Sequence, residues 1–224
     1  EGRNIAVRMD LSKLLTTHVA VLAKSGAGKS YTVGVLLEEI LECKVPVLVI
    51  DPHGEYGTMS SPNTNPKELS SCKEFGVTPK GYDVRVFSVN QEGRPLKLSS
   101  TLSQDELLHL LPGKLSGTQL GVLYSALKKL DQFSFSGLML ELEKDESNAK
   151  WGIMNLVDYF QNMSIFSDTP TPHQELLAPG TMSLLSLKGV NPETQEILVF
   201  KVCKDLFELR KLNRIPPFFL VVEE

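Results

Sequence analysis

Cysteine and tryptophan are both scarce in this chain of 224 residues, which has three cysteines and one tryptophan. Cys43, Cys72 and Cys203 are odd in number and widely spaced, and no two of them form a C-x-x-C pair. This pattern excludes a disulfide framework and gives no indication of a thiolate metal site. We therefore expect reduced, mostly buried thiols, as in a cytoplasmic protein.

An excess of basic charge is also absent, because 23 Lys and Arg residues stand against 27 Asp and Glu residues, for a net charge of −4. This balance excludes a histone-like binder, although it allows a local basic groove. Apolar runs such as residues 45–50 and 218–222 are far shorter than the roughly 20 residues of a membrane span. No signal-peptide pattern opens the chain either, so we expect no membrane association.

The apolar and β-branched residues that are present gather in short runs, which predict strands at residues 5–9, 19–22, 45–50, 83–89, 182–187 and 218–222. Three of these runs (19–22, 45–50 and 218–222) are apolar throughout, which is typical of strands covered on both faces by helices. Helical spacing of apolar residues fills residues 29–43 and 193–212. The chain therefore predicts an α/β fold, with a mainly parallel sheet sandwiched by helices.

The pattern changes between about residues 97 and 178, where β-like runs almost disappear. Helical spacing appears at residues 102–111, 116–130, 137–145 and 150–163, with breaks at Pro112-Gly113 and at residues 134–137. We interpret this stretch as an all-helical insertion of three to five short helices, packed on one edge of the sheet.

The most specific local pattern is Ala-Lys-Ser-Gly-Ala-Gly-Lys-Ser at residues 23–30, between the run 19–22 and the predicted helix 29–43. This is the context of a phosphate-binding P-loop, in which glycines let successive N–H groups turn toward a phosphate at the start of a helix. Lys29 would add positive charge for the β- and γ-phosphates, and Ser30 a hydroxyl for Mg²⁺. Ala23 replaces the usual first glycine without closing the loop. We predict an ATP or GTP site at Ser25, Gly26, Ala27, Gly28, Lys29, Ser30 and Tyr31.

A P-loop also needs an acidic partner for Mg²⁺ at the end of a neighbouring strand, and the chain offers Asp51 and the pair Glu223-Glu224. The pair fits the Walker B pattern better. Glu223 would hold the Mg²⁺ shell directly or through water, and Glu224 would polarise the attacking water as the catalytic base alongside Lys29. Adjacent residues of a strand point to opposite sides, which allows these two roles. The alternative is that two glutamates at a chain end are simply solvated.

A third polar cluster, Asp-Pro-His-Gly-Glu-Tyr-Gly at residues 51–57, follows the predicted strand 45–50. Open α/β sheets bind ligands at the carboxyl ends of their strands. Asp51 would then be a second acid near Mg²⁺, and His53 or Glu55 would sense the γ-phosphate. The same spacing also fits a polar loop built from Asx and glycine turns, with no role in catalysis.

Taken together, residues 18–30, 49–56 and 220–224 resemble the archaeal HerA family of the HerA/FtsK superfamily, and Asp-Pro-His-Gly-Glu-Tyr is the most specific of these strings. The resemblance spans residues 1–224. It implies a RecA-like P-loop NTPase that uses ATP and Mg²⁺ to move double-stranded DNA through a homo-hexameric ring. It also implies a NurA-type nuclease partner in the resection and repair of DNA ends.

The resemblance further implies that residues 1–224 are an incomplete RecA-like ATPase domain, without the family's N-terminal β-barrel and the C-terminal part of the core. The arginine finger and sensor residues would then lie beyond Glu224. One alternative is a conjugation or secretion ATPase of the same superfamily. Another is a nucleotide-binding regulatory module without motor activity. The scattered Lys and Arg residues do not identify a DNA-binding surface.

Overall fold

The computed structural model describes residues 7–90, 92–111 and 115–223. The chain forms two compact units. The first, called the sheet unit here, comprises residues up to 94, Pro172–Gly189 and the residues from 206 onward. The second, called the helical unit, comprises Pro95–Thr171 and Val190–Asp205.

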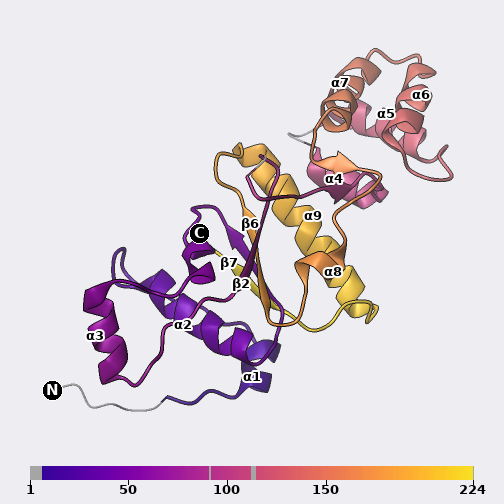
Figure 1. The fold of residues 1–224 in the computed structure, drawn as a ribbon. Coiled ribbons are helices and arrows are strands. Elements are labelled where there is room, and N and C mark those ends of the chain that lie inside the picture. Colours follow the sequence, from indigo (N-terminus) through magenta and orange to yellow (C-terminus); the bar gives the residue numbers. More distant parts are fainter. Residues whose placement is uncertain (1–6, 91, 112–114, 224) are drawn as a thin grey trace. The chain divides into compact units, whose positions relative to one another are not determined.

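The sheet unit holds most of the strands together with several helices (Figure 1). Its elements are α1 (Leu11–Thr16), α2 (Lys29–Glu42), β1 (Val47–Asp51), the 3-10 helix η1 (Tyr56–Ser60), α3 (Pro66–Glu74), β2 (Asp83–Ser88), α8 (His173–Leu176), β6 (Thr181–Ser186) and β7 (Phe219–Val222). The short strand β3 (Arg94–Pro95) begins at the boundary of this unit.

The strands form one sheet in the order β3-β2-β6-β1-β7. β1 lies parallel to β6 and to β7, with Val47 opposite Met182 on one side and Phe219 on the other. β2 is likewise parallel to β6. The predicted α/β class with a mainly parallel sheet is therefore confirmed. Because parallel strands share one direction, Asp51 and the residue after Val222 lie at the same edge of the sheet.

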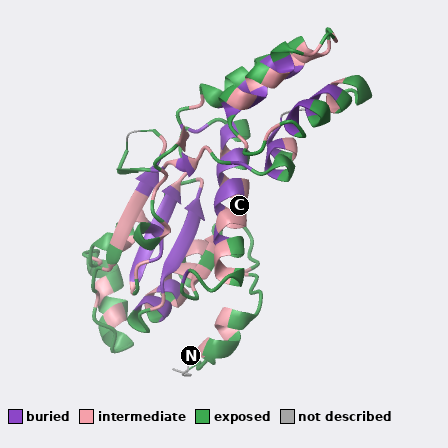
Figure 2. Ribbon diagram, turned by 90° about the vertical axis from the view of Figure 1, so that its right-hand side faces the viewer, coloured by how far each residue is buried: buried purple, intermediate pink, exposed green. Residues whose placement is uncertain are grey.

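One face of the sheet packs against α2 in a single hydrophobic core. Leucine and isoleucine side chains of α2, spaced three and four residues apart, meet alternate residues of β1 and β6, and this core consists of Leu37, Ile40, Leu41, Val47, Val49, Tyr56, Met182 and Leu184. β1 is buried along its whole length and β6 along nearly all of it (Figure 2). The prediction that residues 45–50 form a covered strand is confirmed.

Two predicted strands differ from the structure. Residues 19–22 form no strand, and Val19 and Leu22 are 49% and 91% exposed. Residues 7–9 are also irregular, and the rest of the predicted strand 5–9 lies outside the described residues. An apolar run becomes a strand only where a neighbouring backbone can pair with it, and no pairing of these residues is found in the part of the chain that the structure describes.

β7 forms where it was predicted, but it is not covered on both faces. Its residues alternate between half-buried and exposed, and Leu220 and Val222 are 38% and 61% exposed. β7 is the last strand in the order of the sheet as described, so only one of its edges is paired. Its apolar composition therefore does not imply the burial that β1 has.

The cysteines are free thiols, as predicted, but they are not mostly buried. Cys43 is exposed, while Cys72 and Cys203 are partly exposed. Cys43 is the C-cap of α2, where the chain leaves the hydrophobic core. Burial raises the pKa of the Cys203 thiol. Separately, no helix within the described ranges combines the length and apolarity needed to cross a membrane.

The helical unit contains β4 (Leu98–Ser99), α4 (Gln104–Leu110), α5 (Gly117–Leu127), α6 (Phe135–Glu143), α7 (Lys150–Gln161), β5 (Phe166–Ser167) and residues 192–205 of α9 (Pro192–Lys211). Serine side chains at positions 103, 116 and 134 cap the starts of α4, α5 and α6. The four helices predicted here are confirmed. β4 and β5 pair in parallel, so the stretch is mostly rather than entirely helical. Its interpretation as an insertion into a larger core stays a prediction.

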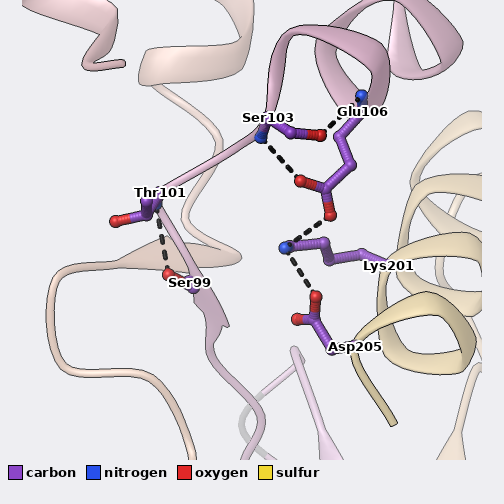
Figure 3. A network of polar contacts seen from close by, with 6 residues as sticks. All are labelled: Ser99, Thr101, Ser103, Glu106, Lys201 and Asp205. Carbon is purple, nitrogen blue, oxygen red and sulfur yellow. Dashed lines mark hydrogen bonds and ion pairs between the residues drawn. The ribbon is translucent and has the colours of Figure 1, made fainter. Parts of the chain in front are cut away.

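A buried ion pair joins α4 to α9 within the helical unit (Figure 3). The Lys201 ammonium donates to Glu106 Oε1 at 2.9 Å and to Asp205 Oδ1 at 2.7 Å. The other oxygen of Glu106 accepts the backbone N–H of Ser103 at 2.6 Å, which completes a capping box at the start of α4. Lys201 and Glu106 are 3% and 7% exposed. Each charge therefore has its partners inside the protein.

Candidate functional site

The glycine-rich segment at residues 23–30 forms an open loop that leads into α2. Gly26 and Gly28 have φ angles of 75° and 92°, a left-handed conformation that other residues rarely adopt. The Ala27 N–H donates to the Lys24 carbonyl at 3.0 Å and tightens the turn. A Cβ built on Gly26 or Gly28 would meet nothing within 4 Å, so the glycines are needed for the path of the backbone and the space beside them is open.

The start of α2 is suited to binding an anion. Gly28 is the N-cap and supplies no side-chain acceptor for the first helical amides. The first hydrogen bond of the helix runs from the Thr32 N–H to the Gly28 carbonyl at 2.9 Å. The amides before it cannot be satisfied within the helix, and the helix dipole adds a partial positive charge at the same place. A phosphate is the kind of group that such a terminus binds.

Glu223 lies at the carboxyl end of β7, beside this loop. Its N–H donates to the Ile50 carbonyl at 3.2 Å, which continues the pairing of β7 with β1. Glu223 Oε2 is 3.6 Å from Lys29 Nζ, and the two side chains are 9% and 29% exposed. The structure thus brings together the lysine of the loop and the acid that were predicted to share a site. Glu224 lies outside the described residues, and its role as a base stays a prediction.

Tyr56 contacts both the acid at the end of β7 and the phosphate loop. Its hydroxyl donates to Glu223 Oε1, and a side-chain hydrogen bond also links it with Ser30. Burial, the hydrogen bond to Glu223 and the negative charges of Glu223 and Glu55 raise the pKa of Tyr56, against a smaller lowering by Ser30. Tyr56 therefore keeps its proton and remains a hydrogen-bond donor throughout the neutral range.

Asp51 organises the loop that carries Tyr56. Its Oδ1 accepts the N–H groups of Gly54 and Glu55 at 2.7 and 3.2 Å, and its Oδ2 accepts the N–H of Tyr56 at 3.3 Å. Asp51 is only 1% exposed. These contacts form the Asx-type turn that was predicted as the alternative to a catalytic role. The turn lies at the carboxyl ends of the strands, where a ligand-binding role for Asp51 would also place it. A role for Asp51 near Mg²⁺ stays a prediction.

The other residues of this loop lie at the surface. His53 and Glu55 are both exposed, and their role as sensors of a γ-phosphate stays a prediction. Sequence reasoning missed Tyr56, although this residue is part of the Asp-Pro-His-Gly-Glu-Tyr string at residues 51–56. An aromatic residue at the end of a polar loop is a signal of burial, and Tyr56 is 3% exposed as the first residue of η1.

The donor set fits a magnesium ion that is bound mainly through a nucleotide. Mg²⁺ in phosphate sites takes one or two protein ligands and completes its shell with phosphate oxygens and water. The Ser30 hydroxyl and the Glu223 carboxylate are hard oxygen donors linked by one intervening hydroxyl. No group of three or more His, Cys, Asp or Glu side chains suited to a metal occurs among the residues described, so an all-protein cage is not built there.

Comparison with known protein families gives a match over most of the chain. A family model described as the central domain of the helicase HerA matches residues 1–206. The segment that matches includes the glycine-rich loop, the loop at residues 51–57 and the helical unit.

Several curated relatives bear the same name. The DNA double-strand break repair helicase HerA of Sulfolobus acidocaldarius is 25% identical over 244 residues, covering 100% of this chain and 46% of that protein. Its namesake from Saccharolobus solfataricus is 27% identical over 225 residues, covering 94% and 42%. That of Pyrococcus furiosus is 42% identical over 62 residues, covering 27% and 11%. The chain thus spans less than half the length of these relatives.

A solved structure has a similar fold. The structure of VirB4 of Thermoanaerobacter pseudethanolicus matches with a TM-score of 0.57 and 17% identity, covering 90% of this chain and 59% of that one. At this identity the likeness concerns the fold alone, and it agrees with the parallel sheet described above.

Proposed function

Since the chain belongs to the family of the central domain of the helicase HerA, we propose that it is the ATP-hydrolysing part of a motor that acts on double-stranded DNA. The observation that carries this proposal is the geometry at Lys29. An open glycine loop at an uncapped helix start places this lysine 3.6 Å from the acid that ends the neighbouring strand β7. An anion-binding loop and an acid next to it are two of the parts that ATP hydrolysis requires.

In this proposal the backbone amides of residues 25–31 hold the phosphates of ATP. Lys29 turns from Glu223 toward the β- and γ-phosphates, whose charge exceeds that of one carboxylate. Ser30 and Glu223 hold the Mg²⁺ shell, and the ion when bound neutralises the charge that develops on the phosphate oxygens. Glu224 orients and deprotonates the attacking water.

The partners that we propose come from the names of the relatives and from the resemblance of the sequence. The relatives are called DNA double-strand break repair helicases, which supports double-stranded DNA as the polymer that is moved. A homo-hexameric ring and a NurA-type nuclease complete the proposal. An electron micrograph of the full-length protein with ATP and DNA tests the ring, and co-purification with a nuclease tests the partner.

Two alternatives remain distinguishable by experiment. A conjugation or secretion ATPase has the weaker support, because the likeness to VirB4 is one of fold at 17% identity. A regulatory module that binds ATP without moving DNA predicts nucleotide binding and no stimulation by DNA.

Hydrolysis of ATP by the full-length protein, with and without double-stranded DNA, tests the main proposal. We expect DNA to stimulate the rate. Lys29→Ala should weaken ATP binding at least 10-fold, because a charge-assisted contact to the phosphates is lost. Glu224→Gln should keep ATP binding and lower the rate about 10²–10⁴-fold, as expected for loss of a general base. Lys67→Ala, an exposed residue on α3, is the matched control for loss of a lysine.

Three results would each contradict part of this proposal. Normal turnover by Glu224→Gln would remove the base assignment. Unchanged ATP affinity in Lys29→Ala would place the nucleotide elsewhere. Hydrolysis that DNA does not stimulate would favour the regulatory module over the motor.

A further inference from the structure

The loop at residues 51–57 has no part in the function proposed so far, yet it ends at the centre of the site. On the basis of that proposed function, we propose that Tyr56 is a positioning residue for Glu223. Its hydroxyl holds one carboxylate oxygen of Glu223 so that the other is presented to the phosphate loop and to the Mg²⁺ of the bound nucleotide.

The two oxygens of Glu223 have different neighbours. Oε1 accepts the hydrogen bond of the Tyr56 hydroxyl, whereas Oε2 lies 3.6 Å from Lys29 Nζ. A carboxylate on a flexible glutamate side chain would otherwise rotate between orientations. With Oε1 engaged, Oε2 is held on the side of the phosphate loop. Ser30, the other proposed Mg²⁺ ligand, also shares a hydrogen bond with Tyr56, so one hydroxyl is tied to both ligands.

Tyr56 is itself held firmly, which a positioning residue requires. Its side chain is 3% exposed and belongs to the hydrophobic core formed by α2, β1 and β6. Its backbone N–H donates to Asp51, which is the last residue of β1. The position of the hydroxyl is therefore fixed relative to β1, which is paired with a strand on each side. Burial of the ring also excludes stacking on a nucleotide base as its role.

These contacts give the first and last residues of the Asp-Pro-His-Gly-Glu-Tyr string a structural role. Asp51 at its start caps the loop, and Tyr56 at its end reaches Glu223 at the end of the adjacent strand β7. The spacing of five residues is what allows one carboxylate to accept N–H groups from positions 54, 55 and 56. Ligating carboxylates are generally oriented by such hydrogen bonds, and loss of the partner typically costs 10–100-fold in metal affinity.

Titration of ATP into the full-length protein by calorimetry, at a series of Mg²⁺ concentrations and without Mg²⁺, tests the inference. We expect Tyr56→Phe to bind Mg²⁺-free ATP as the wild type does. The Mg²⁺ concentration that gives half of the gain in ATP affinity should rise about 10–100-fold. Tyr82→Phe is the matched control, because it removes a hydroxyl that donates to another glutamate, Glu42, at 3.3 Å.

A double-mutant cycle separates positioning from a merely structural effect. In a Glu223→Gln background, Tyr56→Phe should cause little further change in the Mg²⁺ requirement, because the carboxylate that it orients is gone. Melting curves without nucleotide report whether Tyr56→Phe is folded, and the conservative substitution keeps the ring in the core.

The outcomes distinguish this inference from the proposed function. If neither the wild type nor Tyr56→Phe binds ATP, the proposed nucleotide site is wrong. If ATP binds and both proteins require the same Mg²⁺ concentration, the positioning role is overturned while the site stands. If Tyr56→Phe loses affinity equally with and without Mg²⁺, or acts additively with Glu223→Gln, the hydroxyl acts on the fold rather than on Glu223.

Discussion

Among single residues, Asp51 links the buried strand β1 to the candidate site. A buried carboxylate is costly unless it is hydrogen-bonded, and both oxygens of Asp51 are engaged by backbone N–H groups. The hydrogen bonds from Gly54 and Glu55 are partly buried, whereas the one from Tyr56 is buried. Water can therefore replace Asp51 more readily at the first two amides than at the third.

This difference sets the expected cost of removing the carboxylate. Asp51→Ala should lower the free energy of unfolding by about 2–3 kcal/mol, most of it from the buried Tyr56 N–H that loses its acceptor. Asp51→Asn, which keeps one acceptor oxygen, should lose about half as much. Urea unfolding at neutral pH measures both. Asp10→Ala, which removes an exposed cap of α1, is the control, and an equal loss in Asp10→Ala and Asp51→Ala would contradict the argument.

The residues of the site differ in how far the sequence could predict them. Lys29 and Glu223 were expected to meet because a P-loop motif and an acid after an apolar strand are local patterns with known partners. Tyr56 could not be assigned in this way, because its hydroxyl acts on a residue 167 positions away in the chain. A contact of that kind depends on the order of β1 and β7 in the sheet, which no local pattern contains.

At the scale of elements, α2 could be predicted from a local pattern, whereas the structure of residues 19–22 could not. The amphipathic spacing of α2 specifies both the helix and the face that is buried, since its hydrogen bonds are internal to the segment. A strand needs a second backbone, so an apolar run is only a candidate until its neighbour is known. β1 has neighbours on both sides and is buried, whereas β7 is paired along one edge and is half-exposed.

The pairing of α4 with α9 through Glu106 and Lys201 predicts a pH-dependent stability. Burial alone would raise the pKa of Glu106, but hydrogen bonds from the Ser103 backbone and from Lys201, with the charge of Lys201, lower it below its ordinary value of 4.5. The unfolded chain then takes up a proton more readily than the folded one. The contribution of Glu106 is therefore complete above about pH 4.5 and is lost as the pH falls through the folded-state pKa.

Glu106→Gln tests this contribution. Breaking a buried ion pair costs about 3–5 kcal/mol, and we expect about 2–3 kcal/mol here because Asp205 still pairs with Lys201. Urea unfolding from pH 7 down to pH 3 should show the variant less stable at neutral pH, with the difference shrinking in acid. Glu141→Gln, which removes the more exposed ion pair between Glu141 of α6 and Lys144, should change little. A constant difference across the pH range would contradict the assignment.

At the scale of the whole molecule, the net charge of −4 has to be reconciled with the proposed motor, which would have to bind DNA. The average charge matters less than the number of cationic groups that reach phosphates, because each releases a condensed counterion. In the proposed homo-hexamer, one such group on each subunit would already engage about six phosphates. An acidic subunit can therefore form a ring that binds DNA strongly at low salt.

The number of phosphates that the proposed ring contacts sets the salt dependence of DNA binding by the full-length protein with ATP bound. With about six phosphates neutralised, log Kobs should fall with log[salt] with a slope of about −5, so that affinity drops roughly 10³-fold between 50 and 200 mM salt. Fluorescence anisotropy of a labelled duplex measures the slope. Lys29→Ala should leave it unchanged when binding is compared without nucleotide, because Lys29 is paired with Glu223 rather than placed on a DNA surface. A slope near zero would mean that the proposed ring does not contact the phosphate backbone. The protein would then have to bind DNA through uncharged contacts.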